Sequence, residues 1–269
     1  GTELHTSNIV NGLANEFDST VIYPASLGYL YTDAVSKKVS KHLREVKVAK
    51  ENNLAVEHFG GLPADLYSNV IEENFTRFLN GVNYDVVHFQ HLSGWSTFLL
   101  PIIAKKMGKK VILSLHDFYL LCPELNLIYS YTNQRCGKNI ADPNDKSCLY
   151  CLGTKRYNRC PEKAEALDEY LTERNYLVRK IIDAADLVIV PSNFVADKFL
   201  TAFGNLIKEK ISIVPHGITQ LEKIARPKLS KKFRVGFLGN ATVRKGIFVF
   251  LEAVKKLHNQ DFEFEVFGI

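Results

Sequence analysis

Short apolar runs of strand length alternate along most of the chain with longer segments in which apolar residues recur at helical spacing. A first helix is entered from Gly1-Thr2, and residues 29–58 favour two polar strands over one basic helix. Nearly continuous apolar strands separated by helices are typical of a parallel sheet covered on both faces, so the pattern predicts an α/β, Rossmann-like domain. The other predicted strands are residues 19–24, 85–89, 110–115, 187–190 and 211–214, and the other predicted helices are residues 64–80, 98–107, 161–184 and 193–203.

A polar segment with a proline and several lysines, residues 219–232, interrupts this alternation and is typical of a linker. A new strand–glycine–helix–strand pattern follows it. One βαβ unit of this size is too small to bury its own faces, so we expect a second domain that is begun and not finished. The sequence thus predicts a first domain over residues 1–218 and the beginning of a second, truncated domain over residues 233–269.

The charge balance is modestly basic, with 34 Lys and Arg against 29 Asp and Glu and a net charge of +5. This suits contact with phosphates or an anionic membrane surface, although many cytosolic proteins have the same balance. No segment has the roughly 18 uncharged apolar residues that a membrane span needs. We expect a cytoplasmic location, with possible peripheral contact on the inner face of the membrane. The basic residues that would favour anionic lipid, or simply form a solvated face, are Lys37, Lys38, Lys41, Arg44 and Lys47.

All five cysteines lie between Cys122 and Cys160, in a polar insertion of the first domain. An odd number of cysteines without a visible secretion signal indicates reduced thiols rather than a disulfide framework. Cys148 and Cys151 have the C-x2-C spacing of metal ligands, and with Cys122 and Cys136 they can close a tetrahedral zinc site. A loop of unliganded cysteines is an equal alternative.

Polar side chains follow the predicted strands where each strand ends. Ligands of doubly wound sheets bind outside the carboxyl ends of the strands. His91, His116-Asp117 and His216 follow three strands of the first domain, and Arg244-Lys245 lies in the loop after the first strand of the second. One histidine at a strand end is more often a packed or capping residue than a catalyst. Several together favour a functional site.

Five sequence motifs extend over nearly the whole chain. They are YDVVHFQHLSG (84–94), ILSLHDFYLLCP (112–123), ADLVIVPS (185–192), IVPHGI (213–218) and VGFLGNATVRKG (235–246). Each is weak alone, but as an ordered set they have the order and spacing typical of family-4 glycosyltransferases. The opening Gly1-Thr2-Glu3 is also similar to the end of that family's glycine-rich loop. The chain therefore resembles the acceptor-side domain, plus the opening of the donor-side domain, of such an enzyme with the two-Rossmann-domain GT-B fold.

The resemblance implies a retaining transfer of a sugar from a nucleotide diphosphate donor to a hydroxyl of a glycan or lipid-linked acceptor. Such an enzyme would serve polysaccharide or glycoconjugate biosynthesis. Apart from the nucleotide sugar as substrate and the possible structural zinc, no other cofactor is expected, and no nucleic acid partner. The alternatives are a sugar-nucleotide epimerase or phosphorylase of the same architecture, which lack this motif set, and a non-catalytic module that holds an acceptor or a partner subunit.

The resemblance also assigns donor-binding residues. Gly1 and Thr2 would approach the phosphates with backbone N–H groups at a helix N-terminus. Lys245 matches the family lysine that binds the diphosphate, whereas Asn240 stands where an arginine is usual. Either Arg244 supplies the second positive charge, or donor binding is weakened.

The remaining implied residues belong to the reaction itself. His116 matches the family histidine beside the donor sugar, and Asp117 would orient its imidazole or cap the following segment. Glu3 and His91 would face the acceptor. We expect His116 and Lys245 to meet across a cleft between the two domains. The family's pair of glutamates near the end of the second domain has no counterpart in the sequence given.

Overall fold

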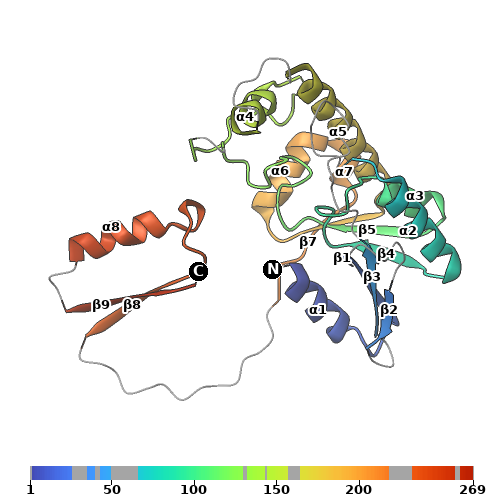
Figure 1. Ribbon diagram of the computed structural model, residues 1–269, viewed down its shortest axis with the longest axis horizontal. Helices are drawn as coiled ribbons and strands as arrows, with labels where there is room; N and C mark the ends of the chain where they lie inside the picture. Colours follow the sequence, from blue (N-terminus) through green and yellow to red (C-terminus); the bar gives the residue numbers. More distant parts are fainter. Residues whose placement is uncertain are drawn as a thin grey trace. The chain divides into compact units, whose positions relative to one another are not determined.

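The computed structural model describes residues 2–25, 35–39, 43–49, 66–129, 132–142, 144–156, 164–217, 232–257 and 261–268. The chain divides into two compact units (Figure 1). The first comprises Gly1–Tyr131 and Arg135–Thr219, and the second comprises Gln220–Ile269 with Thr132–Gln134. Both contain helices and parallel strands, as expected for an α/β, Rossmann-like fold. The predicted linker lies outside the described residues except for Lys232.

A parallel four-stranded sheet forms the centre of the first unit, with the order β4-β5-β6-β7. Its strands follow the apolar runs of the sequence, and the two middle strands are the most deeply buried. Val111 and Val188, on the two middle strands, are 0% exposed. The strands are β4 (Val86–Phe89), β5 (Lys110–Ser114), β6 (Leu187–Val190) and β7 (Ile211–Ile213).

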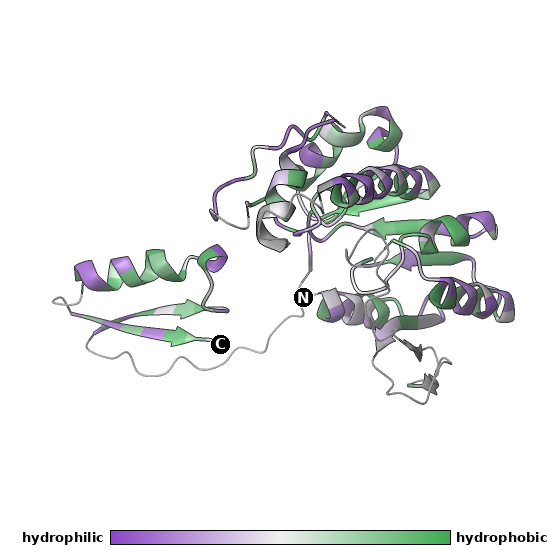
Figure 2. Ribbon diagram, turned by 45° about the horizontal axis from the view of Figure 1, so that its top comes forward, coloured by the Kyte–Doolittle hydropathy of each residue, from purple (hydrophilic) through white to green (hydrophobic). Residues whose placement is uncertain are grey.

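Helices with one apolar face cover this sheet. α3 packs against β4 and β5, and α6 packs against β6 and β7. Figure 2 shows apolar residues concentrated in the strands and polar residues on the outer faces of the helices. Phe98 and Phe199 are fully buried in this core. The helices are α2 (Asn69–Gly81), α3 (Leu100–Lys106), α5 (Ala164–Ala184), α6 (Asn193–Phe203) and the short α7 (Asn205–Lys208).

Capping residues set where two of these helices begin. The Ser192 hydroxyl accepts a hydrogen bond from the Val195 N–H at the start of α6, as its place after a strand predicts. The prediction that a helix begins at residue 64 is wrong, because the Ser68 side chain caps α2 by accepting from the Ile71 N–H. Leu66 is not helical, since its carbonyl accepts from the Phe98 N–H at 2.9 Å.

A smaller sheet in the first unit has the order β1-β3-β2. β1 (Ser19–Ala25) is parallel to β3 (Leu43–Ala49), and β2 (Val35–Lys38) is antiparallel to β3. Two strands therefore occur within residues 29–58, as the valine and lysine mixture favours. Helix α1 (Thr2–Gly12) precedes this sheet, and none of its residues is fully buried. Of the five basic residues considered for lipid contact, only Arg44 has a described side chain, and it is exposed.

The second unit contains two parallel strands and a helix. β8 (Phe233–Leu238) pairs with β9 (Phe262–Phe267), and between them lie the 3-10 turn η2 (Val243–Lys245) and α8 (Ile247–Leu257). Many of its apolar side chains are exposed, among them Leu238 at 85%. This agrees with the expectation that one βαβ unit cannot cover its own faces. In neither unit is a described helix both long and apolar enough to cross a membrane.

Asp186, the residue that precedes β6, connects neighbouring elements at the amino-terminal end of the main sheet. Its carboxylate accepts hydrogen bonds from the Val111 N–H at 2.9 Å and from the ammonium groups of Lys105 at 2.7 Å and Lys110 at 3.3 Å. The Lys105 hydrogen bond, above all, lowers the pKa of Asp186 to about 2. One carboxylate thus joins α3, β5 and the start of β6.

We expect Asp186→Asn to lower the free energy of unfolding by about 1–2 kcal/mol at neutral pH, because the amide loses the charge-assisted contacts. A carboxyl whose folded pKa is depressed stabilises the fold above its unfolded pKa of about 4, and this contribution is lost as the pH falls towards 2. Urea denaturation at several pH values should therefore show the two proteins converging below pH 4. The control is Asp168→Asn, which removes the exposed Lys146 ion pair and should cost less than about 1 kcal/mol. A constant difference between pH 7 and 2 would contradict the assignment.

Candidate functional site

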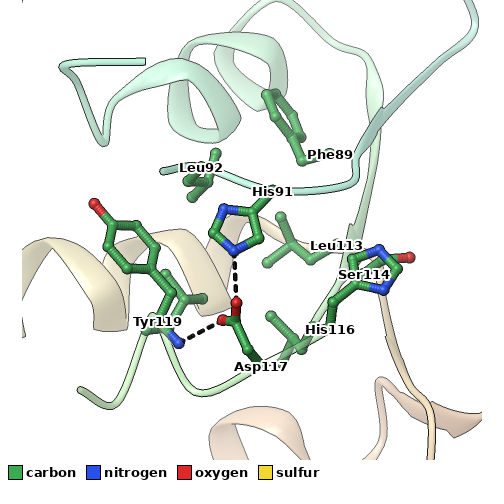
Figure 3. Close-up of a pocket in the computed structure, with 10 residues that line it drawn as sticks. Phe89, His91, Leu92, Leu113, Ser114, His116, Asp117 and Tyr119 are labelled. Carbon is green, nitrogen blue, oxygen red and sulfur yellow. Dashed lines mark hydrogen bonds and ion pairs between the residues drawn. The ribbon is translucent and has the colours of Figure 1, made fainter. Parts of the chain in front are cut away.

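Polar residues gather where strands of the four-stranded sheet end. Gln90 and His91 follow β4, His116 and Asp117 follow β5, and His216 follows β7. Because these strands are parallel, their carboxyl ends lie along one edge of the sheet. Figure 3 shows the side chains of His91, Asp117 and His116 at this edge.

His91 and Asp117 form a hydrogen-bonded pair at this edge. The His91 Nε2 lies 2.9 Å from the Asp117 Oδ2, and the Ser93 N–H donates to the His91 Nδ1 at 2.9 Å. Since Nδ1 accepts, Nε2 carries the proton and donates it to the carboxylate. Both ring nitrogens of His91 are engaged, so the residue expected to face the acceptor is held by its own neighbours.

Asp117 caps the turn that follows it as well as holding His91. Its Oδ1 accepts from the Tyr119 N–H at 2.8 Å. Burial alone would raise the pKa of Asp117, but the hydrogen bonds from His91 and Tyr119 keep it below its usual value, so the group is ionised at neutral pH. The expectation that Asp117 orients the ring of His116 is wrong, because β4 places His91 within reach of the carboxylate instead.

His116 is oriented by Gln90 rather than by an acid. Its Nε2 lies 3.0 Å from the Gln90 Oε1, and its Nδ1 lies 3.0 Å from the His216 Nε2. A carbonyl oxygen only accepts, so the His116 Nε2 carries the proton and its Nδ1 lone pair accepts from the His216 N–H. A substrate hydroxyl that displaced His216 would meet this lone pair.

The Gln90 side chain also continues the network inwards. Its amide nitrogen lies 3.2 Å from the Nε2 of His88, and that Nε2 lies 2.9 Å from the Oγ of the buried Ser114. The chain of polar contacts therefore runs from Ser114 through His88, Gln90 and His116 to His216. Such a network fixes the side-chain rotamers at the end of β4 and β5.

Helix α1 brings a further histidine to the same place. The ring centroid of His5 lies 4.8 Å from that of His116 and 4.5 Å from that of His216, and the other two rings are 4.9 Å apart. One ring nitrogen from each histidine can be chosen so that all three lie within 4.8 Å of one another. In the described part of the chain, no other three potential metal ligands lie so close together.

Three histidines at this edge, His5, His88 and His116, have lowered pKa values and are neutral at physiological pH. Burial, followed by the nearby His5 and His216, lowers the pKa of His116 to about 4. Burial also lowers the pKa of His88 to about 4, and burial followed by His216 lowers that of His5. These rings therefore offer N–H donors and lone pairs rather than positive charges.

A buried arginine supports the loop that carries Asp117. Arg174, on α5, is 1% exposed, and its guanidinium donates to the carbonyl oxygens of Tyr119 and Leu120. It also lies 5.2 Å from the ring centroids of both Phe98 and Tyr119. Tyr119 in turn stacks on His91, with ring centroids 5.4 Å apart. Arg174 thus fixes the backbone on which the site is built.

The pocket behind these side chains is small. Its cavity is about 20 Å³ and is lined by residues of the ends of β4 and β5, including His91, His116 and Asp117. This volume holds about one water molecule and no sugar. A substrate of the first unit would therefore bind on the open side of the histidines and not in this pocket.

The residues assigned to donor binding lie in two places. Gly1 lies outside the described residues, and Thr2 begins α1. Glu3 is exposed, and the hydrogen bond with its own backbone lowers its pKa, with a smaller contribution from His91. This electrostatic coupling places Glu3 near the same edge of the sheet.

The second unit carries Asn240, Arg244 and Lys245 in the loop between β8 and α8. All three are exposed, and η2 ends at Gly246, whose φ of 82° suits a glycine. Neither basic side chain forms an ion pair with a described residue. Two exposed cations thus stand just before the N-terminus of α8, where backbone N–H groups also attract anions.

The cysteine insertion brings four thiols into one neighbourhood. Cys148 and Cys151 lie on α4 (Ser147–Arg156), a helix that the sequence reading missed. Burial raises the pKa of Cys148 and of Cys136, and Cys122 adds to both shifts, so these thiols interact. Cys122 and Cys151 are buried. The four thiols do not form a group of ligand atoms as close as the three histidines, and Cys160 lies outside the described residues, so the zinc site stays a prediction.

No protein-family model matches this chain, and no curated protein matches it either. The glycosyltransferase motifs therefore remain a resemblance.

The sequence did not predict a role in this site for His5, Gln90 or Arg174. His5 lies on the helix whose first residues are expected to contact the donor phosphates and the acceptor, and Gln90 lies within the motif at residues 84–94. Arg174 lies on α5. The spacing of α5 does contain a signal, because residues 167, 171, 174, 178 and 181 form one buried face. A charged residue on such a face is a candidate for a buried hydrogen-bonding role.

Proposed function

We propose that this chain forms the acceptor-side domain and the beginning of the donor-side domain of a retaining, nucleotide-sugar-dependent glycosyltransferase of the GT-B type. The observation that carries the proposal is the convergence of His91, His116 and Asp117 at the carboxyl edge of one parallel sheet. Ligands of doubly wound folds bind at this edge. The ordered family motifs supply the reaction class.

In this proposal the hydrogen-bonded His91–Asp117 pair forms a fixed side of the site, and His116 is the side chain that contacts the sugar. The Gln90 carbonyl holds the His116 Nε2–H, so that the Nδ1 lone pair points outwards to His216. A neutral imidazole in this orientation accepts a hydrogen bond from a sugar hydroxyl. A glycan or lipid-linked hydroxyl is the proposed acceptor, and a cytoplasmic, membrane-peripheral location suits such an acceptor.

The second unit supplies the diphosphate contacts in this proposal. Charge builds up on the leaving diphosphate oxygen as the glycosidic bond breaks, so positive groups there stabilise the transition state. Lys245 and Arg244 are exposed cations before the N-terminus of α8, and Arg244 would replace the charge that Asn240 lacks. That His116 and Lys245 face each other stays a prediction.

We expect Lys245→Ala to weaken nucleotide-diphosphate binding by about 1.5–3 kcal/mol, roughly 10–150-fold, as for a charge-assisted hydrogen bond. The protein encoded by the complete reading frame is first screened with UDP, GDP and ADP by thermal shift. Calorimetry with the nucleotide that binds then compares the variants. Lys256→Ala, an exposed cation at the other end of α8, is the control and should bind like the wild type. Equal affinity of the Lys245 variant and the wild type would refute the diphosphate role.

A further inference from the structure

Three histidines from distant parts of the sequence meet in the first unit. His5 comes from the second turn of α1, His116 from the end of β5 and His216 from the end of β7. Their rings are mutually tilted by 41° to 75° and their centroids are 4.5–4.9 Å apart. Rings packed only for burial would not need three imidazoles, and His216 is exposed. One ring nitrogen of each histidine can be chosen so that all three nitrogens lie within 4.8 Å of one another.

The nitrogen separations are close to those of a metal site. Zn²⁺ binds imidazole nitrogen at about 2.0–2.1 Å, so two nitrogens on one tetrahedral ion lie about 3.3 Å apart. The His116 Nδ1 and His216 Nε2 are 3.0 Å apart, and the nearest set that includes His5 lies within 4.8 Å. A small rotation of the His5 side chain closes the remaining distance, because His5 is not fully buried and α1 has no buried residue.

An outer partner already orients the central ligand. Metal-binding histidines usually donate their second ring N–H to a carboxylate or carbonyl, which fixes the tautomer. The Gln90 Oε1 accepts from the His116 Nε2 at 3.0 Å, which leaves the Nδ1 lone pair directed at the other two histidines. The amide of Gln90 is itself held near His88. The support expected around a metal ligand is thus present without an ion.

We propose that His5, His116 and His216 bind a divalent late transition metal ion such as Zn²⁺. Three imidazoles without a carboxylate suit zinc, copper or nickel and not Mg²⁺ or Ca²⁺, which prefer oxygen ligands. Asp117, the residue after His116, is engaged by His91. Because His216 is exposed, a fourth coordination position opens to solvent. In the metal-bound state the ion takes the His116 Nδ1 lone pair, so a sugar oxygen would bind to the ion at this fourth position and not to the ring. On metal binding, the His216 proton moves to Nδ1, so that its Nε2 lone pair faces the ion.

The site is tested with Zn²⁺ alone, by calorimetry on the whole chain and without any nucleotide sugar, so the result does not depend on the transfer activity. Cys136→Ser with Cys148→Ser is the background, since it removes two thiols of the predicted cysteine zinc site. We expect one Zn²⁺ per chain. His5→Gln and His216→Gln should each weaken binding more than tenfold, since loss of an outer partner alone costs about 10–100-fold. His258→Gln, a histidine of the second unit, is the matched control and should bind like its parent.

A second measurement keeps the test decisive if the serine background does not fold. Co²⁺ bound by imidazoles alone shows weak visible bands and lacks the intense sulfur-to-cobalt absorption of a thiolate site. In the wild-type chain, weak visible bands without the sulfur-to-cobalt absorption support the site, provided that these bands vanish in His216→Gln. Two results overturn the proposal: no saturable Zn²⁺ binding in folded protein, or Zn²⁺ binding that is unchanged in His5→Gln and His216→Gln.

Discussion

Arg174→Ala is expected to lower the free energy of unfolding by about 3–5 kcal/mol. The guanidinium fills space between the Phe98 and Tyr119 rings, so truncation leaves a cavity of the kind that costs about 2–5 kcal/mol. It also leaves the buried carbonyls of Tyr119 and Leu120 without their donor, at about 1–3 kcal/mol each. The alanine variant also no longer pays the desolvation cost of a buried guanidinium, whose Nε has no acceptor among the described residues, and this offsets part of the loss.

Urea denaturation of three variants separates these contributions. Arg174→Met keeps most of the volume and removes the donors, so it should cost less than the alanine variant. Lys180→Ala changes an exposed residue of the same helix and should stay within about 0.5 kcal/mol of the wild type. An alanine variant as stable as the lysine control would show that the loop after β5 holds its shape without Arg174.

The parallel sheet could be predicted from the sequence because its middle strands are short apolar runs buried between helices. The run at residues 187–190 matches β6 residue for residue, and helix α6 has the predicted bounds. In these segments the apolar period and a capping serine act locally and agree with the tertiary packing. Local sequence is then sufficient evidence.

Other elements could not be placed because their bounds depend on distant residues. α2 starts later than its apolar pattern suggests, since the Leu66 carbonyl is used by Phe98 and not by a helical turn. α4 escaped prediction because its residues, SCLYCLGTKR, combine cysteine, glycine and threonine and show little amphipathic spacing. α4 packs against α5, and this tertiary contact stabilises a helix that its sequence pattern does not predict.

The sequence predicted where the residues of the candidate site lie, but not which of them form hydrogen bonds with one another. Parallel topology brings the residues after β4, β5 and β7 to one edge, so His91, His116 and His216 could be foreseen there. Which histidine forms a hydrogen bond with Asp117 depends on ångström-scale side-chain geometry, and in the structure it is His91. His5 was missed because an amphipathic pattern does not say how a helix is oriented towards a neighbouring sheet.

Among the residues of the proposed catalytic site, His116 is expected to have the largest effect on turnover. In the protein encoded by the complete reading frame, His116→Ala should lower turnover about 10²–10⁴-fold, the usual contribution of a positioned proton-transfer or hydrogen-bonding side chain. Donor affinity should change far less, because a group that serves the transition state is lost from turnover and not from ground-state binding. Steady-state kinetics together with nucleotide calorimetry measures the two quantities separately.

His91→Gln is the informative comparison for this prediction. The glutamine disrupts the pair with Asp117, which follows the adjacent strand, but leaves the Gln90–His116 contact in place, so turnover should fall less than in His116→Ala. Thermal unfolding of both variants shows whether the network from Ser114 to His216 survives, because His116 links Gln90 to His216. If His116→Ala folds normally and turns over substrate at the wild-type rate, His116 is a strand-end histidine held by Gln90. The transfer chemistry would then have to come from residues beyond this edge of the sheet.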